Sequence, residues 1–348
     1  MKYIYVSRNA NRSGYHILEH LINADLYPIA VILPETSINP KNFLSEVKQF
    51  HGEPLRFTKS IKLLARSNNV PVLELKSIKT EDAWSYLNHM TPDLIVLGGG
   101  WPELIPEKVI SLPKLGVLNT HPSILPDYRG TDIHRWQIAA GVKKSGVTIH
   151  YIDKHFDTGD ILDQAIVDVE PKDSPQDLFE KIACISGPLM ESTIKRIWAN
   201  SPKKTKGKKQ IGRKDNRRYY GRWDWENSDF LKINWRRSAS ELVNFIRACS
   251  QESFLYNGPH TSCNGKKFII READIITHKL NIQAPGKIID INDDGAIIST
   301  GSEFLMVNLK LIQRATEKGW PTEPNTSLAY DAKKNLENCK IKIGDCFI

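Results

Sequence analysis

The sequence lacks the features that would place it in a membrane or in an oxidising compartment. Its 348 residues contain no run of about 18 apolar residues, which argues against a membrane-spanning helix. The first residues lack the charged, apolar and small-residue order of a secretory signal peptide. Its five cysteines are odd in number and scattered, which favours reduced thiols over a disulfide framework. We therefore expect a cytoplasmic protein without a membrane partner.

The excess of positive charge is confined to one segment. The net charge is +8, and residues 203–222 contain ten Lys or Arg against one Asp, so the rest of the chain sums to about −1. Such a segment favours either a phosphate contact, to a nucleic acid or a nucleotide, or a solvated linker that its own charge keeps extended. The residues leave both interpretations open.

Short apolar runs alternate with helical patterns over the first part of the chain. The pattern predicts strands at residues 2–6, 29–33, 70–75, 94–97, 115–118 and 147–152. Helical spacing follows a predicted N-cap at Ser13 and recurs at residues 61–65, 83–90 and 171–199. This alternation predicts an α/β fold with an open, mostly parallel, Rossmann-like sheet. Ligands of such sheets bind at the carboxyl ends of the strands.

The second part of the chain has a different pattern. A helix is predicted within residues 233–250, with Ser238 as its cap. Short apolar pieces broken by Gly, Asn and Asp then follow at residues 267–270, 287–291, 296–299 and 304–309. Such pieces are typical of a small β-barrel or sandwich. We therefore expect a catalytic domain over residues 1–200, a basic linker over 201–225 and a smaller C-terminal domain over 226–348.

Two polar side chains follow the apolar run at residues 115–118. Asn119 and His121 share strand parity, so both side chains lie on one face if the strand extends that far. Pro122, Pro126 and Gly130 then restrict the backbone. An amide donor beside an imidazole suits the stabilisation of an oxyanion. The plain alternative is a capping asparagine and a hydrogen-bonded surface histidine.

A turn that begins at Asp157 follows the strand predicted at residues 147–152. Its Asp-Thr-Gly also occurs in aspartic proteases, but this chain has no second Asp-Thr-Gly and no all-β pattern. An ordinary turn residue is the alternative for Asp157. His134, His150 and His155 show no spacing typical of a metal site, and no metal is expected.

The two polar segments together resemble a known signature. GVLNTHPSILPDYRG, residues 116–130, and SGVTIHYIDKHFDTGDIL, residues 145–162, look like the paired motifs of the 10-formyltetrahydrofolate-dependent formyltransferases. The resemblance implies that Asn119, His121 and Asp157 are the catalytic residues. It also implies an enzyme of one-carbon metabolism that takes 10-formyltetrahydrofolate as co-substrate.

The resemblance extends into the second half of the chain. RRYYGRWDWENSDFLKINW, residues 217–235, and SASELVNFIRA, residues 238–248, are similar to the linker and the start of the C-terminal domain of methionyl-tRNA and UDP-aminoarabinose formyltransferases. That domain is an open barrel of the OB type, so the resemblance implies an OB-like C-terminal domain. Glycinamide ribonucleotide formyltransferases lack it and match only the first domain.

Formyl transfer gives each of the three residues a chemical role. An amine attacks the formyl carbon on folate N10, and negative charge develops on the formyl oxygen. Asn119 would donate a hydrogen bond to this oxygen, worth about 3 kcal/mol. His121 would also donate to it, or pass a proton toward the leaving nitrogen. Asp157 would orient His121 or accept a proton from the attacking amine, directly or through water.

The resemblance implies a pterin pocket between a glycine turn and the segment before Asp157. The implied folate-binding residues are Gly98, Gly99, Gly100, Trp101, Leu104, Ile152, Asp153 and Phe156. Three glycines directly after a strand suit a close backbone approach to a flat ring. A plain glycine turn is the alternative.

The acceptor side departs from the pattern of the tRNA enzymes. Pro122 stands where they have a small residue, and TDIHRWQI at residues 131–138 replaces their Ala-Ala-Pro run. The insertion at residues 34–57 also differs from their loop that enters the tRNA acceptor stem, although long loops of this kind often bind ligands. The implied acceptor-binding residues are Ser123, Arg129, Gly130, Arg135 and Trp136.

We therefore predict a small amine as the acceptor, in the first place a nucleotide-linked amino sugar. Initiator methionyl-tRNA is the alternative, in which the linker and the C-terminal domain would bind the RNA backbone. A folate-binding protein without turnover is a third interpretation, which the intact trio of residues argues against. The sequence leaves the oligomeric state open.

Overall fold

The computed structural model describes most of the chain as two compact units. The described residues are 1–9, 11–35, 59–212, 219–221, 223–249, 258–277, 284–302, 305–315 and 330–348. The N-terminal unit comprises Met1–Ile133, Lys144–Val169 and Leu178–Tyr220, and the C-terminal unit comprises His134–Lys143, Glu170–Asp177 and Gly221–Ile348. All but the first two residues of the predicted insertion at 34–57 lie outside the described residues. The domain boundaries at residues 200 and 225 stay predictions.

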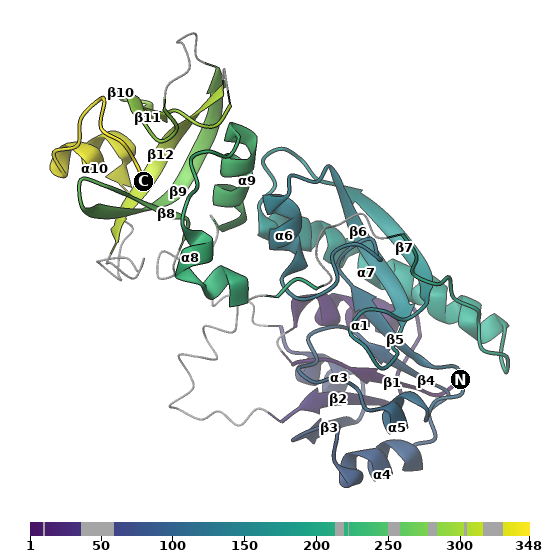
Figure 1. Ribbon diagram of the computed structural model, residues 1–348. Helices are drawn as coiled ribbons and strands as arrows, with labels where there is room; N and C mark the ends of the chain where they lie inside the picture. Colours follow the sequence, from purple (N-terminus) through teal and green to yellow (C-terminus); the bar gives the residue numbers. More distant parts are fainter. Residues whose placement is uncertain are drawn as a thin grey trace. The chain divides into compact units, whose positions relative to one another are not determined.

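A seven-stranded sheet forms the centre of the N-terminal unit (Figure 1). Its strands are β1 (Tyr3–Val6), β2 (Ala30–Pro34), β3 (Val72–Leu75), β4 (Leu94–Leu97), β5 (Val117–His121), β6 (Lys144–Tyr151) and β7 (Ile161–Asp168). They lie in the order β3-β2-β1-β4-β5-β6-β7. The first five of these are parallel, whereas β6 and β7 are added antiparallel. The predicted α/β class with a mostly parallel sheet is therefore confirmed.

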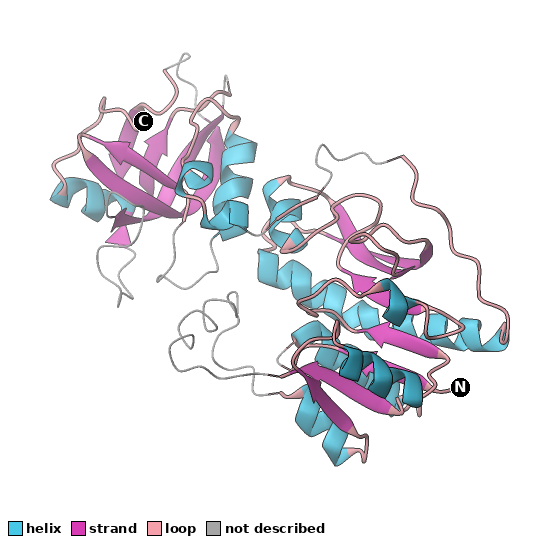
Figure 2. Cartoon of the chain, turned by 60° about the horizontal axis from the view of Figure 1, so that its bottom comes forward, coloured by secondary structure: helices cyan, strands magenta, loops and turns pink. Residues whose placement is uncertain are grey.

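Helices cover both faces of this sheet (Figure 2). They are α1 (Arg12–Asn23), α3 (Ile61–Ser67), α4 (Glu81–His89), α5 (Glu107–Ile110) and α7 (Pro175–Ala199). Alternate residues of β1 face opposite layers: Tyr3 and Tyr5 join the core under α1, α3 and α7, and Ile4 and Val6 join the core under α4 and α5. Strands buried on both faces read as continuous apolar runs, which explains why the sequence located them.

The cap of α1 differs from the prediction. Asn11, and not Ser13, is the N-cap, and its side chain accepts a hydrogen bond from the Gly14 backbone N–H at 2.5 Å. Asparagine and serine cap equally well, so the sequence offered two candidates two residues apart. The helix therefore begins two residues earlier than a cap at Ser13 would place it, and Ser13 lies in its first turn.

Strand β5 is longer than the apolar run that predicted it. The prediction ended it at residue 118, whereas it continues to His121. Asn119 pairs with Leu97 on β4 and with His150 on β6, and His121 pairs with Thr148. Strands on both sides therefore hold Asn119 in extended backbone inside the sheet, and β6 holds His121.

The C-terminal unit is built on an antiparallel sheet. Its strands are β8 (His260–Cys263), β9 (Lys266–Thr277), β10 (Ile288–Asn292), β11 (Gly295–Ile298), β12 (Leu305–Ala315) and β13 (Tyr330–Asp331), in the order β10-β11-β12-β9-β8 with β13 on β12. The helical elements are α6 (Ile133–Ala139), η1 (Trp223–Glu226), α8 (Ser228–Leu231), α9 (Ala239–Cys249) and α10 (Ala332–Asn338). Ser238 stands before α9 as predicted, and its hydroxyl accepts from the Glu241 backbone N–H at 3.3 Å. A small C-terminal β domain is therefore confirmed.

The core of this unit is apolar and aromatic. Phe268 on β9 and Phe347 near the end of the chain are almost fully buried, and their rings meet edge to face at 6.0 Å. Leu242 and Ile246 of α9 pack into the same core. The two residues are four positions apart, so the helix covers the sheet with one apolar face.

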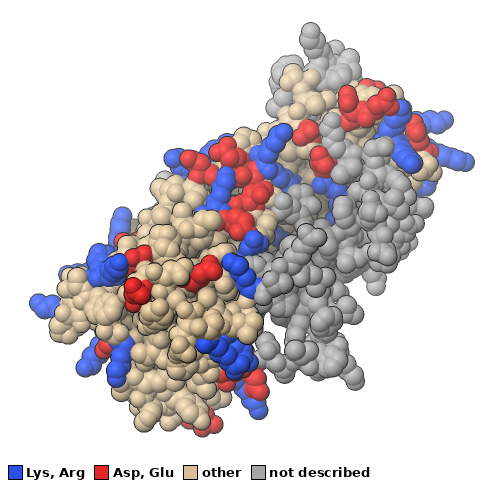
Figure 3. Space-filling model, turned by 180° about the vertical axis from the view of Figure 1, so that it is seen from behind, with Lys and Arg blue, Asp and Glu red and all other residues tan. Residues whose placement is uncertain are grey.

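The surface carries charges of both signs. On the face drawn in Figure 3, basic and acidic side chains of the described residues are interspersed over both units. Within the part of the chain that the structure describes, no helix is long and apolar enough to cross a membrane.

Candidate active site

The three residues singled out in the sequence meet in the N-terminal unit. Asp157 Oδ1 lies 3.5 Å from Asn119 Nδ2 and 3.5 Å from His121 Nδ1. Asn119 and His121 stand on β5, whereas Asp157 stands in the turn between β6 and β7. One carboxylate oxygen therefore faces an amide and an imidazole that are distant from it along the chain.

The sheet and the turn explain this convergence. Residues of equal parity on β5 point to the same face, so Asn119 and His121 lie side by side. Asp157 has a φ of +54°, in the left-handed region that Asp tolerates better than most residues. The Gly130 backbone N–H donates to the other carboxylate oxygen, Oδ2, at 3.1 Å. The carboxylate is thus held at both oxygens.

The protonation of His121 is partly fixed by its neighbours. Its Nε2 lies 2.8 Å from the carbonyl oxygen of Tyr128, so this nitrogen donates and carries a proton. Its Nδ1 is the nitrogen that faces Asp157. His121 is 3% exposed. A second proton on Nδ1 would turn this contact into a nearly buried ion pair, between whose members a proton can be transferred.

His150 is a fourth member of the site, and the sequence analysis missed it. Its Nδ1 donates to the Tyr151 carbonyl at 2.7 Å, so its Nε2 accepts from Asn119 Nδ2 at 3.2 Å. The same Nε2 lies 3.8 Å from Asp157 Oδ1. The sequence assigned His150 to a strand, but only the antiparallel register of β5 and β6 shows that it opposes Asn119.

Burial sets the charge of His150. Desolvation lowers the pKa of His150 below its ordinary value, although the negative charge of Asp157 acts in the opposite direction. His150 is therefore neutral at neutral pH and keeps a lone pair on Nε2. This lone pair holds one N–H of the Asn119 amide. The other N–H points toward Asp157 Oδ1 in a long contact of 3.5 Å. An oxygen atom of a bound substrate can take the place of this carboxylate oxygen as the acceptor.

Exposure distinguishes the members of the site. The side chains of His121 and His150 are 4% and 2% exposed, whereas that of Asp157 is 13% exposed and Asn119 is half-buried. A substrate therefore reaches the amide and the carboxylate before it reaches either imidazole.

The predicted folate residues lie in two segments next to these strands. The glycine turn at Gly98, Gly99 and Gly100 comes directly after Leu97, the partner of Asn119, and the second and third glycines have φ values of +98° and +74°. Trp101 and Ile152 pack against one apolar core, and Leu104 is half-buried.

Two further predicted folate residues belong to the turn itself. Asp153 accepts hydrogen bonds from the His155 backbone N–H at 3.0 Å and the Thr158 hydroxyl at 2.6 Å, so it shapes the turn that carries Asp157. Phe156 is 54% exposed, and its ring lies 6.0 Å from that of Tyr219. An exposed aromatic beside the carboxylate is a surface on which a flat ring can stack. The folate roles of these residues stay predictions.

The predicted acceptor residues are divided between the two units. In the N-terminal unit, Ser123 is buried and donates to the Asp127 carbonyl at 2.8 Å, while Arg129 donates to Gln210. Arg135 and Trp136 stand on α6 in the C-terminal unit, where they are 6% and 8% exposed.

Arg135 and Trp136 pack against aromatic side chains. The Trp136 ring lies 4.7 Å from Trp225 and 5.3 Å from Phe230, and the Arg135 guanidinium lies 5.9 Å from the Trp225 ring. The structure therefore places Arg135 and Trp136 in an aromatic cluster of the C-terminal unit. Their binding role also stays a prediction.

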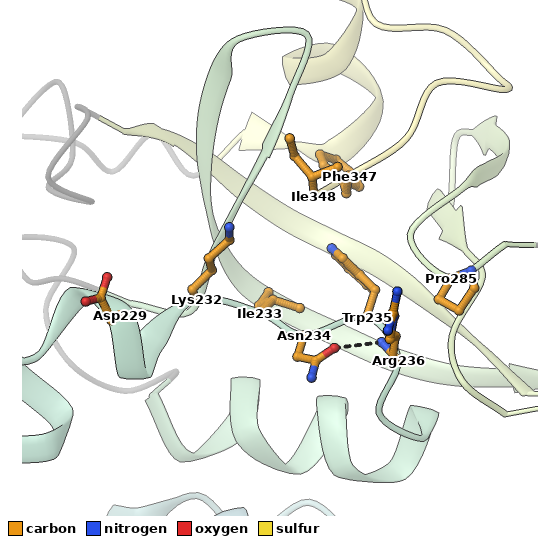
Figure 4. Close-up of a pocket in the computed structure, with 9 residues that line it drawn as sticks. All are labelled: Asp229, Lys232, Ile233, Asn234, Trp235, Arg236, Pro285, Phe347 and Ile348. Atoms are coloured by element: carbon orange, nitrogen blue, oxygen red, sulfur yellow. Dashed lines mark hydrogen bonds between the residues drawn. The ribbon is translucent and has the colours of Figure 1, made fainter.

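A cavity of about 500 Å³ lies within the C-terminal unit (Figure 4). The stacked rings of Trp235 and Phe347, 5.7 Å apart, form part of its lining together with Lys232 and Arg236. Its asparagine, Asn234, already accepts from the Arg236 backbone N–H at 3.1 Å. No histidine lines this cavity, so it lacks the set of donors and acceptors found around Asp157.

Comparisons with known proteins match both halves of the chain to formyltransferases. The formyl transferase family matches residues 44–194, and the formyl transferase C-terminal domain matches residues 227–323. The chain is 29% identical to the methionyl-tRNA formyltransferase of Bacillus cytotoxicus over 70% of this chain and 73% of the relative. It is 29% identical to that of Syntrophus aciditrophicus over 81% of this chain and 82% of the relative.

Two solved structures have a similar fold. One is an N-formyltransferase from Helicobacter canadensis in complex with folinic acid and dTDP-3-aminofucose, with a TM-score of 0.59 and 23% identity over 89% of this chain and 99% of that one. The other is a sugar 3-N-formyltransferase solved with dTDP and 5-formyltetrahydrofolate, with a TM-score of 0.57 and 23% identity over 89% and 98% of the two chains.

The fold, the polar cluster around Asp157 and both matched domains define one class of protein, an enzyme that transfers a formyl group. The chain belongs to the formyl transferase family.

Proposed function

We propose that the chain moves a formyl group from 10-formyltetrahydrofolate to the primary amine of a nucleotide-linked amino sugar or a similar small amine. The observation that carries this proposal is that the side chains of Asn119 and His121 both face one carboxylate oxygen of Asp157. The co-substrate supplies an activated formyl carbon. The residues of this chain supply a hydrogen-bond donor, a proton carrier and a base.

Asn119 stabilises the charge that develops on the formyl oxygen. His150 holds one of its N–H groups, so the amide plane is fixed before the substrates bind. The second N–H exchanges its long contact with Asp157 for a bond to the formyl oxygen. A donor that is oriented in advance stabilises a transition state by about 3 kcal/mol.

His121 and Asp157 move the protons of the reaction. The attacking nitrogen becomes cationic, and Asp157 accepts its proton directly or through a water molecule. His121 keeps one proton on Nε2 through the Tyr128 carbonyl, and its Nδ1 exchanges the other with the carboxylate side of the site. The leaving nitrogen of the co-substrate receives a proton from this pair. Two substrates held side by side provide further acceleration.

Two observations favour a small amine. Pro122 and the segment at residues 131–138 replace the residues typical of the tRNA enzymes. One solved structure of similar fold is an N-formyltransferase in complex with folinic acid and dTDP-3-aminofucose, and another is a sugar 3-N-formyltransferase solved with dTDP and 5-formyltetrahydrofolate. We extend both binding partners to this chain as part of the proposal, and a cytoplasmic location fits them.

A second candidate acceptor is initiator methionyl-tRNA. The observation that favours it is that relatives with up to 29% identity over about 70–80% of the chain are methionyl-tRNA formyltransferases. In this case, the basic segment and the C-terminal unit would bind the RNA backbone, and binding would weaken steeply as salt increases.

One assay separates the two candidates. The full chain is given 10-formyltetrahydrofolate with either a panel of nucleotide amino sugars or charged initiator tRNA, and release of tetrahydrofolate is followed. We expect release with at least one amino sugar, and with none of their N-acetylated forms, which lack the free amine. If only tRNA gives release of tetrahydrofolate, the order of the two acceptors is reversed. If neither the amino sugars nor tRNA give release, the proposal is wrong.

A further inference from the structure

The described part of the basic segment folds onto the N-terminal unit. We call residues 203–212 the strap. Its lysines are exposed, whereas Thr205 is buried and its carbonyl accepts from the Tyr151 hydroxyl at 2.9 Å. Lys208 and Ile161 exchange two backbone hydrogen bonds, of 2.7 and 2.8 Å. The strap is therefore attached to β7. It is not the freely solvated linker that one of the two interpretations of the sequence described.

Gln210 of the strap connects the two loops that carry the site. Its Oε1 accepts from Arg129 Nε at 3.0 Å and from Nη2 at 2.6 Å. Its Nε2 donates to the carbonyl oxygens of Asp157 at 3.0 Å and of Gly159 at 2.8 Å. Both hydrogens of the amide and its oxygen are thus used, and each half of the amide binds a different loop.

These contacts close a ring of hydrogen bonds around Asp157. Gln210 holds Arg129, the next residue Gly130 donates its N–H to Asp157 Oδ2, and the Asp157 carbonyl returns to Gln210. The backbone of Asp157 is in the left-handed region, which costs a residue with a Cβ about 1 kcal/mol or more. The two contacts of Gln210 hold the backbone of this turn, from which the carboxylate projects toward the Gly130 N–H.

The chain beyond the strap reaches the same loops at a second point. The Tyr220 backbone N–H donates to the Arg129 carbonyl at 2.8 Å, and its carbonyl accepts from the Thr131 N–H at 2.9 Å. A Cβ on Gly130, whose φ is +130°, would stand 2.0 Å from the Tyr220 carbonyl oxygen. Only glycine allows this approach. The pKa of the neighbouring Tyr219 hydroxyl is raised by burial and then by the negative charge of Asp157.

We propose that Gln210 is a positioning residue for formyl transfer, which acts through Asp157 and makes no contact with the reacting atoms. This inference rests on the proposed function for its effect on turnover, whereas its effect on the two loops is independent of any substrate. The strap follows the strands of the sheet in the chain, and through Gln210 it helps to set the geometry of the active site.

The test compares Gln210→Ala, Gln210→Glu and Ile211→Ala in the full chain. Ile211 is the next residue of the strap and is 81% exposed, so its variant controls for changes in this segment alone. Gln210→Glu keeps an acceptor for Arg129 but places oxygen against the carbonyls of Asp157 and Gly159. It therefore separates the two halves of the amide.

The first measurement is amide hydrogen exchange, which needs no substrate. Exchange in the segments around Arg129–Thr131 and Asp157–Asp160 should rise about tenfold in Gln210→Ala, while β1 and β4 stay protected. In Gln210→Glu, the rise should be larger in the second segment than in the first. Unchanged exchange in both segments, or an equal rise over the whole unit, would overturn the proposal.

The second measurement is turnover. We expect kcat to fall about tenfold in Gln210→Ala and Gln210→Glu and to stay within twofold in Ile211→Ala, because a small displacement of a catalytic group is costly. In an Asp157→Asn background, Gln210→Ala should cause no further loss of kcat. A full tenfold loss in that background would contradict a role through Asp157. If the wild-type chain transfers no formyl group, the proposed function fails, and the exchange measurement still decides on the strap.

Discussion

Two buried clusters, one in each compact unit, consist of different kinds of side chain. In the N-terminal unit, Asn119, His121 and His150 are drawn together around the carboxylate of Asp157. In the C-terminal unit, the interior is closed by rings such as those of Phe268 and Phe347. Burial of polar groups costs free energy unless each one finds a partner, whereas burial of rings stabilises the fold directly. Under the proposed function, the first cluster serves the chemistry of the enzyme, whereas the second serves its stability.

The largest effect on turnover is expected from a change that removes the carboxylate shared by the polar cluster. Asp157→Asn should lower kcat about 1000-fold, because an amide can neither accept the proton of the amine nor form an ion pair with His121. The protein should remain folded, since the amide oxygen still accepts from the Gly130 N–H. Steady-state release of tetrahydrofolate measures the loss. Asp168→Asn, an exposed carboxylate at the end of β7, serves as the control and should keep wild-type turnover.

A change in the aromatic interior of the C-terminal unit is expected to affect the free energy of unfolding. Phe268→Ala should lower the free energy of unfolding by about 3 kcal/mol, because it leaves a cavity in the core of the C-terminal unit. Urea unfolding measures this loss. The matched change is Ile275→Ala on the same strand, where the side chain is 42% exposed and a loss of less than about 0.5 kcal/mol is expected. Equal losses in the two variants would remove the contrast between the interior and the surface.

A smaller catalytic effect should come from the residue that the sequence analysis missed. His150→Phe removes the acceptor that fixes the Asn119 amide, and we expect kcat to fall about 30-fold. His150→Gln offers an amide oxygen as acceptor and should lose less than about fivefold. Turnover under saturating substrates measures both variants. If Gln is no better than Phe, His150 acts by something other than its hydrogen bond to Asn119.

The smallest effect concerns stability against pH. Burial lowers the pKa of His150 in the folded state, so below about pH 6.5 the unfolded chain binds a proton that the folded chain does not. The wild type should therefore lose stability as the pH falls through this range, and the His150 contribution should be constant at higher pH. Urea unfolding at pH 7.5 and pH 5.5 measures the change. In His150→Gln, the decrease should be smaller than in the wild type, and an equal decrease would contradict a buried neutral imidazole.

The sequence alone predicted much of the N-terminal unit for a physical reason. Strands buried on both faces are apolar throughout, so β4 was predicted with its observed bounds, Leu94–Leu97. The parity of Asn119 and His121 follows from the strand period of two, and it placed them on one face. The later turn at Asp157 was identified by its resemblance to a family motif. These features are local, and local patterns determine them.

Other features depend on contacts between distant segments, which no local pattern encodes. His150 opposes Asn119 only because β5 and β6 pair in one register. Gln210 meets Asp157 across 53 residues of chain. Arg135 lies in the aromatic cluster of the C-terminal unit because α6 belongs to that unit, and its role at the acceptor stays a prediction. The missing information is in each case the three-dimensional pairing of elements, and the composition of the segments does not contain it.

The most direct test of the account is the kcat of Asn119→Ala, Asp157→Asn and the variant with both changes, measured with the acceptor that the wild type uses. Residues that act on one reacting carbonyl are not additive. We predict losses of about 100-fold and 1000-fold in the single variants. The double variant should be no more than about threefold slower than Asp157→Asn alone. Losses that multiply in the double variant, or single variants with near-normal kcat, would show that the amide and the carboxylate do not serve one reaction centre.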